Sequence, residues 1–342
     1  RLAFYTEEPA NPEKPLSDPD RVVADVKAFY AGDQARKLSL TISTHAKTLF
    51  LDFRRTGDPA YVRAFGELLT IMNDNFARGV ASNRNMPPTF EAQELPYFYY
   101  LFEQSDVFTL RNRAEAAELS RKIIEASMDC WEMVGPAESY RKNEPKYWTN
   151  HFAFASRTVY GNSRYLQSRA PIPGLDYFMA VADFTFKGIA GQPLSPEDAG
   201  GYQFLVYRIF TDYMLVNGRA AKDLFASDSF REYVDYAKGA FSHLGFTAGY
   251  GDAKLWGMRG AFVPLFESCE MTGDQESLAI LSMICRSAGG RGFYAEQCQA
   301  LGIPIDLPPP EIPRFSGLTT FTVSPARQEL LGMTPLRHPA LD

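Results

Sequence analysis

Helix boundaries follow one another along almost the whole chain, and they constrain the fold more than any other feature of the sequence. The tripeptide Thr-Gly-Asp occurs at 56–58 and again at 272–274. In both places glycine can end one helix in a left-handed turn while aspartate caps the next helix. Apolar side chains then recur at helical spacing, at Tyr61, Phe65, Leu68 and Met72. The sequence therefore predicts helices that are joined in tight hairpins.

Strand-like segments are scarce before residue 315, so we expect an all-α fold in which short-looped helix pairs form an array. The array is either an open solenoid or a toroid, an incomplete barrel of helical hairpins. The toroid is favoured because no strict sequence repeat marks a regular solenoid. Further helices are predicted at 21–31, 34–54, 91–104, 114–134, 149–160, 173–188, 197–216, 228–241, 256–270 and 291–301.

The character of the chain changes at 303–313, where the sequence IPIDLPPPEIP predicts a stiff extended linker. The next residues, RFSGLTTFTV, are rich in Thr, Phe and Val and are typical of a strand. We therefore predict an α/α toroid domain at 1–302, a proline-rich linker at 303–313, and the start of a β-sandwich domain at 314–342 that would continue in a longer protein.

Composition excludes several classes of function. The net charge of -6 argues against nucleic-acid binding, which requires a basic face. The 4 cysteines form no Cys-x-x-Cys pair, so neither a zinc cluster nor a redox dithiol is indicated. No apolar run approaches the roughly 18 residues of a membrane span, and the first residues, RLAFYTEEPANPEKP, lack a signal-peptide core. Because the chain begins with Arg1, a signal peptide removed earlier is compatible with the sequence.

The segment 146–161, KYWTNHFAFASRTVYG, contains the first candidate functional residues, Asn150 and His151. Histidine is the side chain that exchanges protons most readily near neutral pH, and the chain has only 4 of them. Two interpretations stay open. In the first, Asn150 merely caps a helix through its side-chain oxygen, with His151 as a polar neighbour. In the second, both side chains serve a catalytic site.

A second candidate segment is the tyrosine-rich helix at 196–218, PEDAGGYQFLVYRIFTDYMLVNG. Tyr202, Leu205, Ile209 and Tyr213 fall on one stripe and are expected to pack in the core. Tyr207 lies off this stripe, because five residues turn a helix by roughly 140° from Tyr202. Tyr207 is therefore the ring that we expect to face a central cavity.

Together these features resemble the toroid domain of the heparinase II/III-like and alginate lyase-like polysaccharide lyases. The resemblance rests on the Trp-Thr-Asn-His sequence in a helical array, the tyrosine helix, the sequence FTAGYGDA at 246–253, and the sequence PPPEIPRFSGLTTF at 308–321. Two departures stand out: Gly200 and Gly201 occupy the place of an arginine in some relatives, and a second histidine has no clear counterpart, although His243 lies near that region.

The resemblance implies a periplasmic or secreted enzyme that cleaves an acidic, uronate-containing polysaccharide by β-elimination. It implies no cofactor, although a structural divalent metal could lie in the following β domain. The catalytic residues would be Asn150, His151 and Tyr207: the asparagine donates to the substrate carboxylate, the histidine takes the C5 proton or holds the carboxylate, and the tyrosine protonates the leaving O4 or acts as the base. Substrate-binding candidates are Trp148, Arg157, Tyr202, Arg208, Tyr250 and Lys254.

Two other functions stay open at this point. A glycoside hydrolase on a similar α/α barrel would need two carboxylates flanking the scissile bond, and several acidic residues are available. These are Asp183, Glu197, Asp198, Asp212 and Asp252. The third candidate is a helical scaffold or glycan-binding module without catalytic activity.

Overall fold

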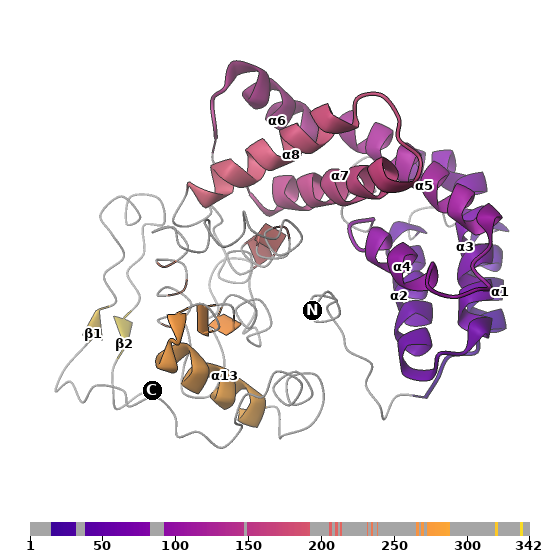
Figure 1. The fold of residues 1–342 in the computed structure, drawn as a ribbon, viewed down its shortest axis with the longest axis horizontal. Helices are drawn as coiled ribbons and strands as arrows, with labels where there is room; N and C mark the ends of the chain where they lie inside the picture. Colours follow the sequence, from indigo (N-terminus) through magenta and orange to yellow (C-terminus); the bar gives the residue numbers. More distant parts are fainter. Residues whose placement is uncertain are drawn as a thin grey trace.

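The computed structural model describes residues 15–31, 38–82, 92–146, 149–191 and 272–287, with short pieces at 205–206, 209–210, 213, 231, 234, 238, 265–266, 268–269, 319–320 and 336–337. These residues are almost entirely helical (Figure 1). The helices are α1 (Pro19–Ala31), α2 (Leu38–Thr56), α3 (Pro59–Ser82), α4 (Leu95–Phe102), α5 (Leu110–Met128), α6 (Trp131–Lys142), α7 (Asn150–Arg169), α8 (Leu175–Ala190) and α13 (Gln275–Ser287). Two short strands, β1 (Thr319–Thr320) and β2 (Leu336–Arg337), pair antiparallel.

The described helices pack as a hairpin array. Helices α1, α3, α5 and α7 contact one another in series, while α2 contacts α4 and α6 contacts α8. Each of the pairs α2/α3, α5/α6 and α7/α8 is joined by a short connection and is also in contact, as short loops between neighbouring helices require. Figure 1 shows α7 lying between α8 and α5. This confirms an all-α helical array in the described residues up to 287.

Both Thr-Gly-Asp turns have the predicted geometry. Gly57 and Gly273 adopt φ values of 66° and 68°, which lie in the left-handed region. Asp58 accepts the backbone N–H of Ala60 at 2.8 Å. Asp274 accepts those of Glu276 and Ser277 at 3.1 and 3.2 Å. The two tripeptides therefore end one helix and cap the next, as their residue types predict.

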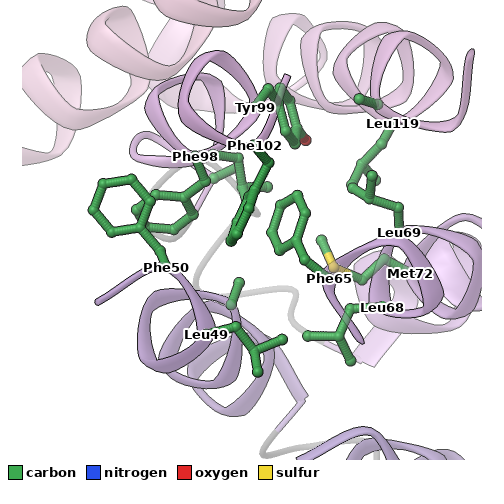
Figure 2. Close-up of a cluster of buried hydrophobic side chains, with 14 of the residues drawn as sticks. Leu49, Phe50, Phe65, Leu68, Leu69, Met72, Phe98, Tyr99, Phe102 and Leu119 are labelled. Atoms are coloured by element: carbon green, nitrogen blue, oxygen red, sulfur yellow. The ribbon is translucent and has the colours of Figure 1, made fainter. Parts of the chain in front are cut away.

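The main core lies among α1 to α5 and is built around aromatic rings (Figure 2). The predicted face of α3, formed by Tyr61, Phe65, Leu68 and Met72, is buried in it. The ring of Phe65 stacks on that of Phe102 from α4, with 4.3 Å between centroids. Helix α4 is short but strongly apolar, and the sequence LPYFYYLF buries most of its side chains against α2 and α3. The α3 prediction is therefore confirmed.

Helix α7 is largely enclosed by its neighbours. Its side chains from Ala153 to Val159 are all buried, because α4, α5, α6 and α8 contact it on several sides. Small residues at Ala153, Ala155 and Ser156 let these neighbours approach closely. The first turn of this helix carries Asn150 and His151.

One predicted helix was wrong. The segment 114–134 is not a single helix, because α5 ends at Met128 and α6 begins at Trp131. Between them Cys130 is extended, with φ -82° and ψ 151°. The break redirects the chain so that α6 packs against α7 and α8. Helix α7 also runs well beyond the predicted end at 160.

The remaining elements are described only in part. Helical backbone occurs within the predicted helices 197–216, 228–241 and 256–270. The predicted helix 291–301 and the linker 303–313 lie outside the described residues. The pair of strands β1 and β2 falls inside 314–342, and the β-sandwich domain stays a prediction, as does the closure of the array into a toroid.

Candidate functional site

The first turn of α7 contains the two residues that the sequence singled out. The N-cap of the helix is Thr149, which is extended and makes no side-chain capping bond. Asn150 is therefore the first helical residue, and the interpretation of Asn150 as the cap is wrong. Its side chain is largely buried, with 7% of the residue exposed. His151 is more open, since 38% of its side chain is exposed.

The neighbours of His151 come from the beginning of α6. The indole of Trp131 lies 5.9 Å from the imidazole, centroid to centroid, and makes an edge contact with Phe152 at 5.0 Å. Trp131 is nevertheless 60% exposed. Oε1 of Glu132 lies 3.8 Å from Nδ1 of His151, and the Glu132 carboxylate is completely buried. An acidic, a basic and an aromatic side chain thus meet where α6 and α7 begin.

Cys130 precedes this cluster and does not contribute a nucleophile to it. Burial, and secondarily the negative charges of Glu132 and Asp129, raise the pKa of the Cys130 thiol to about 11. Its Sγ donates to the carbonyl of Ala126 at 3.1 Å. Because the thiolate is the reactive form, this thiol is inert near neutral pH.

Arg157 lies on α7 six residues after His151, about 9 Å along the helix axis. It is 5% exposed. Its Nη1 donates to Oε1 of Gln93 at 3.0 Å, and its guanidinium lies over the ring of Tyr97 at 5.6 Å. These contacts attach α7 to the start of α4. The guanidinium therefore presents little open surface, and its role in substrate binding stays a prediction.

The segment that carries Tyr207 is described at only a few positions. Ile209 and Tyr213 of the predicted packing stripe are buried, together with Val206 and Phe210. The ring of Tyr213 stacks on that of Phe186 in α8 at 3.9 Å and meets the edge of Tyr160 in α7 at 5.1 Å. The described residue Tyr213 therefore lies against α7 and α8.

Asp183 on α8 has an unusual environment. Desolvation raises the pKa of its carboxyl above the ordinary value, although the hydrogen bond from the hydroxyl of Tyr213 and the charges of Lys187 and Arg164 act in the opposite direction. A carboxyl with a raised pKa holds its proton at higher pH than usual. Burial thus makes the Asp183 carboxyl easier to protonate than that of an exposed aspartate.

Tyr207 itself lies outside the described residues, as do the predicted binding residues Trp148, Tyr202, Arg208, Tyr250 and Lys254. Among the described residues, no three His, Cys, Asp or Glu side chains are grouped so that they could hold a metal ion. None of the helices in the described ranges is long and apolar enough to cross a membrane.

Sequence reasoning missed Trp131 and Glu132. Both lie inside the continuous helix that the sequence predicts at 114–134, where a tryptophan and a glutamate are ordinary residues. The only local signal is an acidic residue in what proves to be the first turn of α6, a position that the helix dipole favours. Their proximity to His151 arises from the packing of α6 on α7.

Comparison with known proteins identifies no relative: no family model, curated protein or solved structure matches this chain.

Proposed function

We propose that this protein is a polysaccharide lyase that cleaves an acidic, uronate-containing polysaccharide by β-elimination. In this proposal the helical array closes into an α/α toroid, a β-sandwich domain follows it, and the protein acts in the periplasm or outside the cell. The serial packing of α1, α3, α5 and α7 supports the toroid, because such an array curls when each hairpin is rotated slightly against the last.

The observation that carries the proposal is the first turn of α7. It combines a neutral amide donor at Asn150 with a partly exposed imidazole at His151. The exposed indole of Trp131 lies beside that imidazole. Aromatic faces of this kind are suited to stacking on the apolar face of a sugar ring. An amide that can donate to a carboxylate and an imidazole that can accept a proton are two of the groups that a uronate elimination uses.

The reaction would proceed in two stages. A base removes the proton from C5, and the electron pair moves toward the adjacent carboxylate to give an enolate-like intermediate. The C4–O4 bond then breaks as the C4=C5 double bond forms, and an acid protonates O4. Asn150 would stabilise the charge that develops on the carboxylate. His151 would take the C5 proton, and Tyr207 would supply the proton to O4.

The contacts of Tyr213 support a place for Tyr207 in this reaction. Tyr213 meets Tyr160 of α7. Tyr213, which follows Tyr207 in the same predicted helix, therefore packs on the helix that carries Asn150 and His151.

The proposal is tested by incubating the protein with a panel of uronate polysaccharides: alginate, glucuronan, ulvan and glycosaminoglycans. A lyase produces an unsaturated uronyl end, which absorbs in the ultraviolet. A hydrolase would produce reducing ends without this absorbance, and a non-catalytic scaffold would produce neither. Absence of the absorbance with every polymer of the panel would contradict the proposal.

The tyrosine is tested by Tyr207→Phe, which removes the hydroxyl and keeps the ring. If this hydroxyl transfers the proton to O4, we expect kcat to fall by roughly 10²–10⁴-fold, the scale for a positioned acid or base. Substrate binding should persist, since the ring remains. Turnover close to that of the wild type on a polysaccharide that the wild type cleaves would exclude Tyr207 as the acid.

A glycoside hydrolase is the second candidate, and the raised pKa of Asp183 favours it specifically. A hydrolase needs a second carboxylate about 5–9.5 Å away. The other predicted acids, Glu197, Asp198, Asp212 and Asp252, lie outside the described residues. Reducing ends without ultraviolet absorbance, abolished by Asp183→Asn, would favour this function over the lyase.

A further inference from the structure

Glu132 is the described side chain whose environment is hardest to explain by folding alone. Its carboxylate is fully buried, and neither oxygen accepts a hydrogen bond. Removing an ionised carboxylate from water without such bonds is costly, and an apolar residue of similar size would suit folding better. Its place in the first turn of α6 offsets only part of this cost. Such a residue is a candidate for a functional role.

The group that Glu132 faces is the imidazole of His151. Oε1 lies 3.8 Å from Nδ1, and Nδ1 is itself buried. The exposed 38% of the His151 side chain therefore consists of other atoms. The indole of Trp131 lies beside the imidazole and is tilted by 36° against it. The buried side of the ring faces the carboxylate, and other atoms of the ring are partly exposed.

We propose that Glu132 is a positioning residue that holds the proton of neutral His151 on Nδ1, so that Nε2 carries the lone pair that accepts a proton from the substrate. This inference rests on the proposed lyase function. A carboxylate accepts a hydrogen bond but does not donate one, so its proximity favours the tautomer with N–H at Nδ1. The 3.8 Å separation exceeds a hydrogen bond, and such contacts often tighten only when substrate binds.

The tautomer can be measured without any substrate. The full chain is labelled with ¹⁵N-histidine, and the imidazole nitrogens are observed by NMR well above the ordinary histidine pKa of about 6.5. Since the chain has 4 histidines, His151→Gln assigns the signal. We expect the proton on Nδ1 in the wild type. A predominant Nε2–H form in the wild type would overturn the inference, and this measurement needs no variant of Glu132.

Glu132→Gln is the matched substitution, because its amide can donate to Nδ1 and stabilise the opposite tautomer. We expect the His151 signal to shift toward the Nε2–H form. Glu138→Gln is the control, since Glu138 lies on the same helix, is exposed, and pairs with Lys142 at 2.6 Å. Its spectrum should match that of the wild type. An unchanged tautomer in folded Glu132→Gln protein would overturn the inference.

Measurements of kcat distinguish the role of Glu132 from the lyase function itself. On a polysaccharide that the wild type cleaves, Glu132→Gln should lower kcat by about 10–100-fold, the scale for carboxylates that orient metal-binding histidines. KM should change little, and Glu138→Gln should be neutral. A tautomer shift with unchanged kcat would overturn the role in catalysis. The wild type could also show the Nδ1–H tautomer and cleave no polymer of the panel. That result would contradict the lyase proposal but would leave the pairing of Glu132 and His151 intact.

Discussion

At the scale of single residues, the first turn of α7 shows why neighbours in sequence have different environments. Asn150 and His151 differ by about 100° around the helix. Asn150 faces the packed interior, whereas His151 keeps part of its ring exposed beside Trp131. The two adjacent residues thus differ in exposure: the amide is largely buried and the imidazole is partly exposed.

Asn150→Ala tests the amide. If it donates to the enolate-like intermediate, kcat should fall by roughly 10²–10³-fold, since one such donor is worth ~2.7–4 kcal/mol in the transition state. Asn162→Ala is the control, because Asn162 is buried on the same helix and donates to the carbonyl of Thr158 at 2.9 Å. It should lower stability without changing kcat. Equal effects of the two variants on kcat would assign Asn150 a structural role.

The raised pKa of the Asp183 carboxyl should make the stability of the folded protein depend on pH. Because burial raises the pKa of its carboxyl above 3.8, the folded state favours the neutral form. The protonated Asp183 carboxyl therefore contributes to the stability of the fold. This contribution is complete below the pKa that the carboxyl has in the unfolded state, and it is lost as the pH rises through the pKa of the folded state. Asp183→Asn keeps an acceptor for Tyr213 and does not titrate. As the pH increases from about 4 to 7, the free energy of unfolding of the wild type should therefore fall relative to that of Asp183→Asn, so the difference in favour of the variant should grow. Urea titrations would measure this difference, and a constant difference would contradict it.

At the scale of elements, the turns between helices follow rules that can be read locally. The left-handed conformation of Gly57 and the capping by Asp58 depend only on residues within the turn. The break at Asp129 and Cys130 is different. Neither glycine nor proline stands there, and cysteine is not a preferred cap. Its position follows from the packing of α6 against α7 and α8.

Gly57→Ala should destabilise the protein by about 1–2 kcal/mol, the cost of a left-handed conformation for a residue with a Cβ atom. No atom lies within 4 Å of the added carbon, so the cost is purely that of the backbone. Gly161→Ala is the opposite case, in the interior of α7, where the new carbon would lie 3.5 Å from Pro96. It should stabilise the protein by roughly 0.5–1 kcal/mol. Thermal unfolding of both variants would reveal the opposite signs.

At the scale of the whole molecule, the two regions of the array have different compositions. The core around α1 to α5 is dominated by aromatic rings such as Phe65, Phe98 and Phe102 (Figure 2). The core between α6, α7 and α8 is smaller, and its members include Met133, Ala155 and Val181. The larger core stabilises the described part of the array, while the candidate site lies at the edge of the smaller one.

Phe65→Ala should remove a large share of the stability. Phe65 is fully buried and stacks on Phe102 at 4.3 Å. Such truncations typically cost 3–5 kcal/mol, roughly a third or more of the stability of a typical domain. Leu110→Ala is the control, because Leu110 is one of the most exposed apolar side chains of the described part, and its loss should cost no more than about 0.5 kcal/mol. Similar midpoints in urea for both variants would contradict this description of the core.

Local patterns in the chain predict the helical class, the two Thr-Gly-Asp turns and the buried face of α3, because periodicity, capping and left-handed glycine act over a few residues. They also indicate Asn150 and His151 as candidate site residues. The packing of the helices was needed to establish that α5 and α6 are separate helices, that Asn150 is not a cap, and that Trp131 and Glu132 meet His151. The contacts of Trp131 and Glu132 with His151 join residues about twenty positions apart in the sequence. They depend on how two helices pack, which no local pattern specifies.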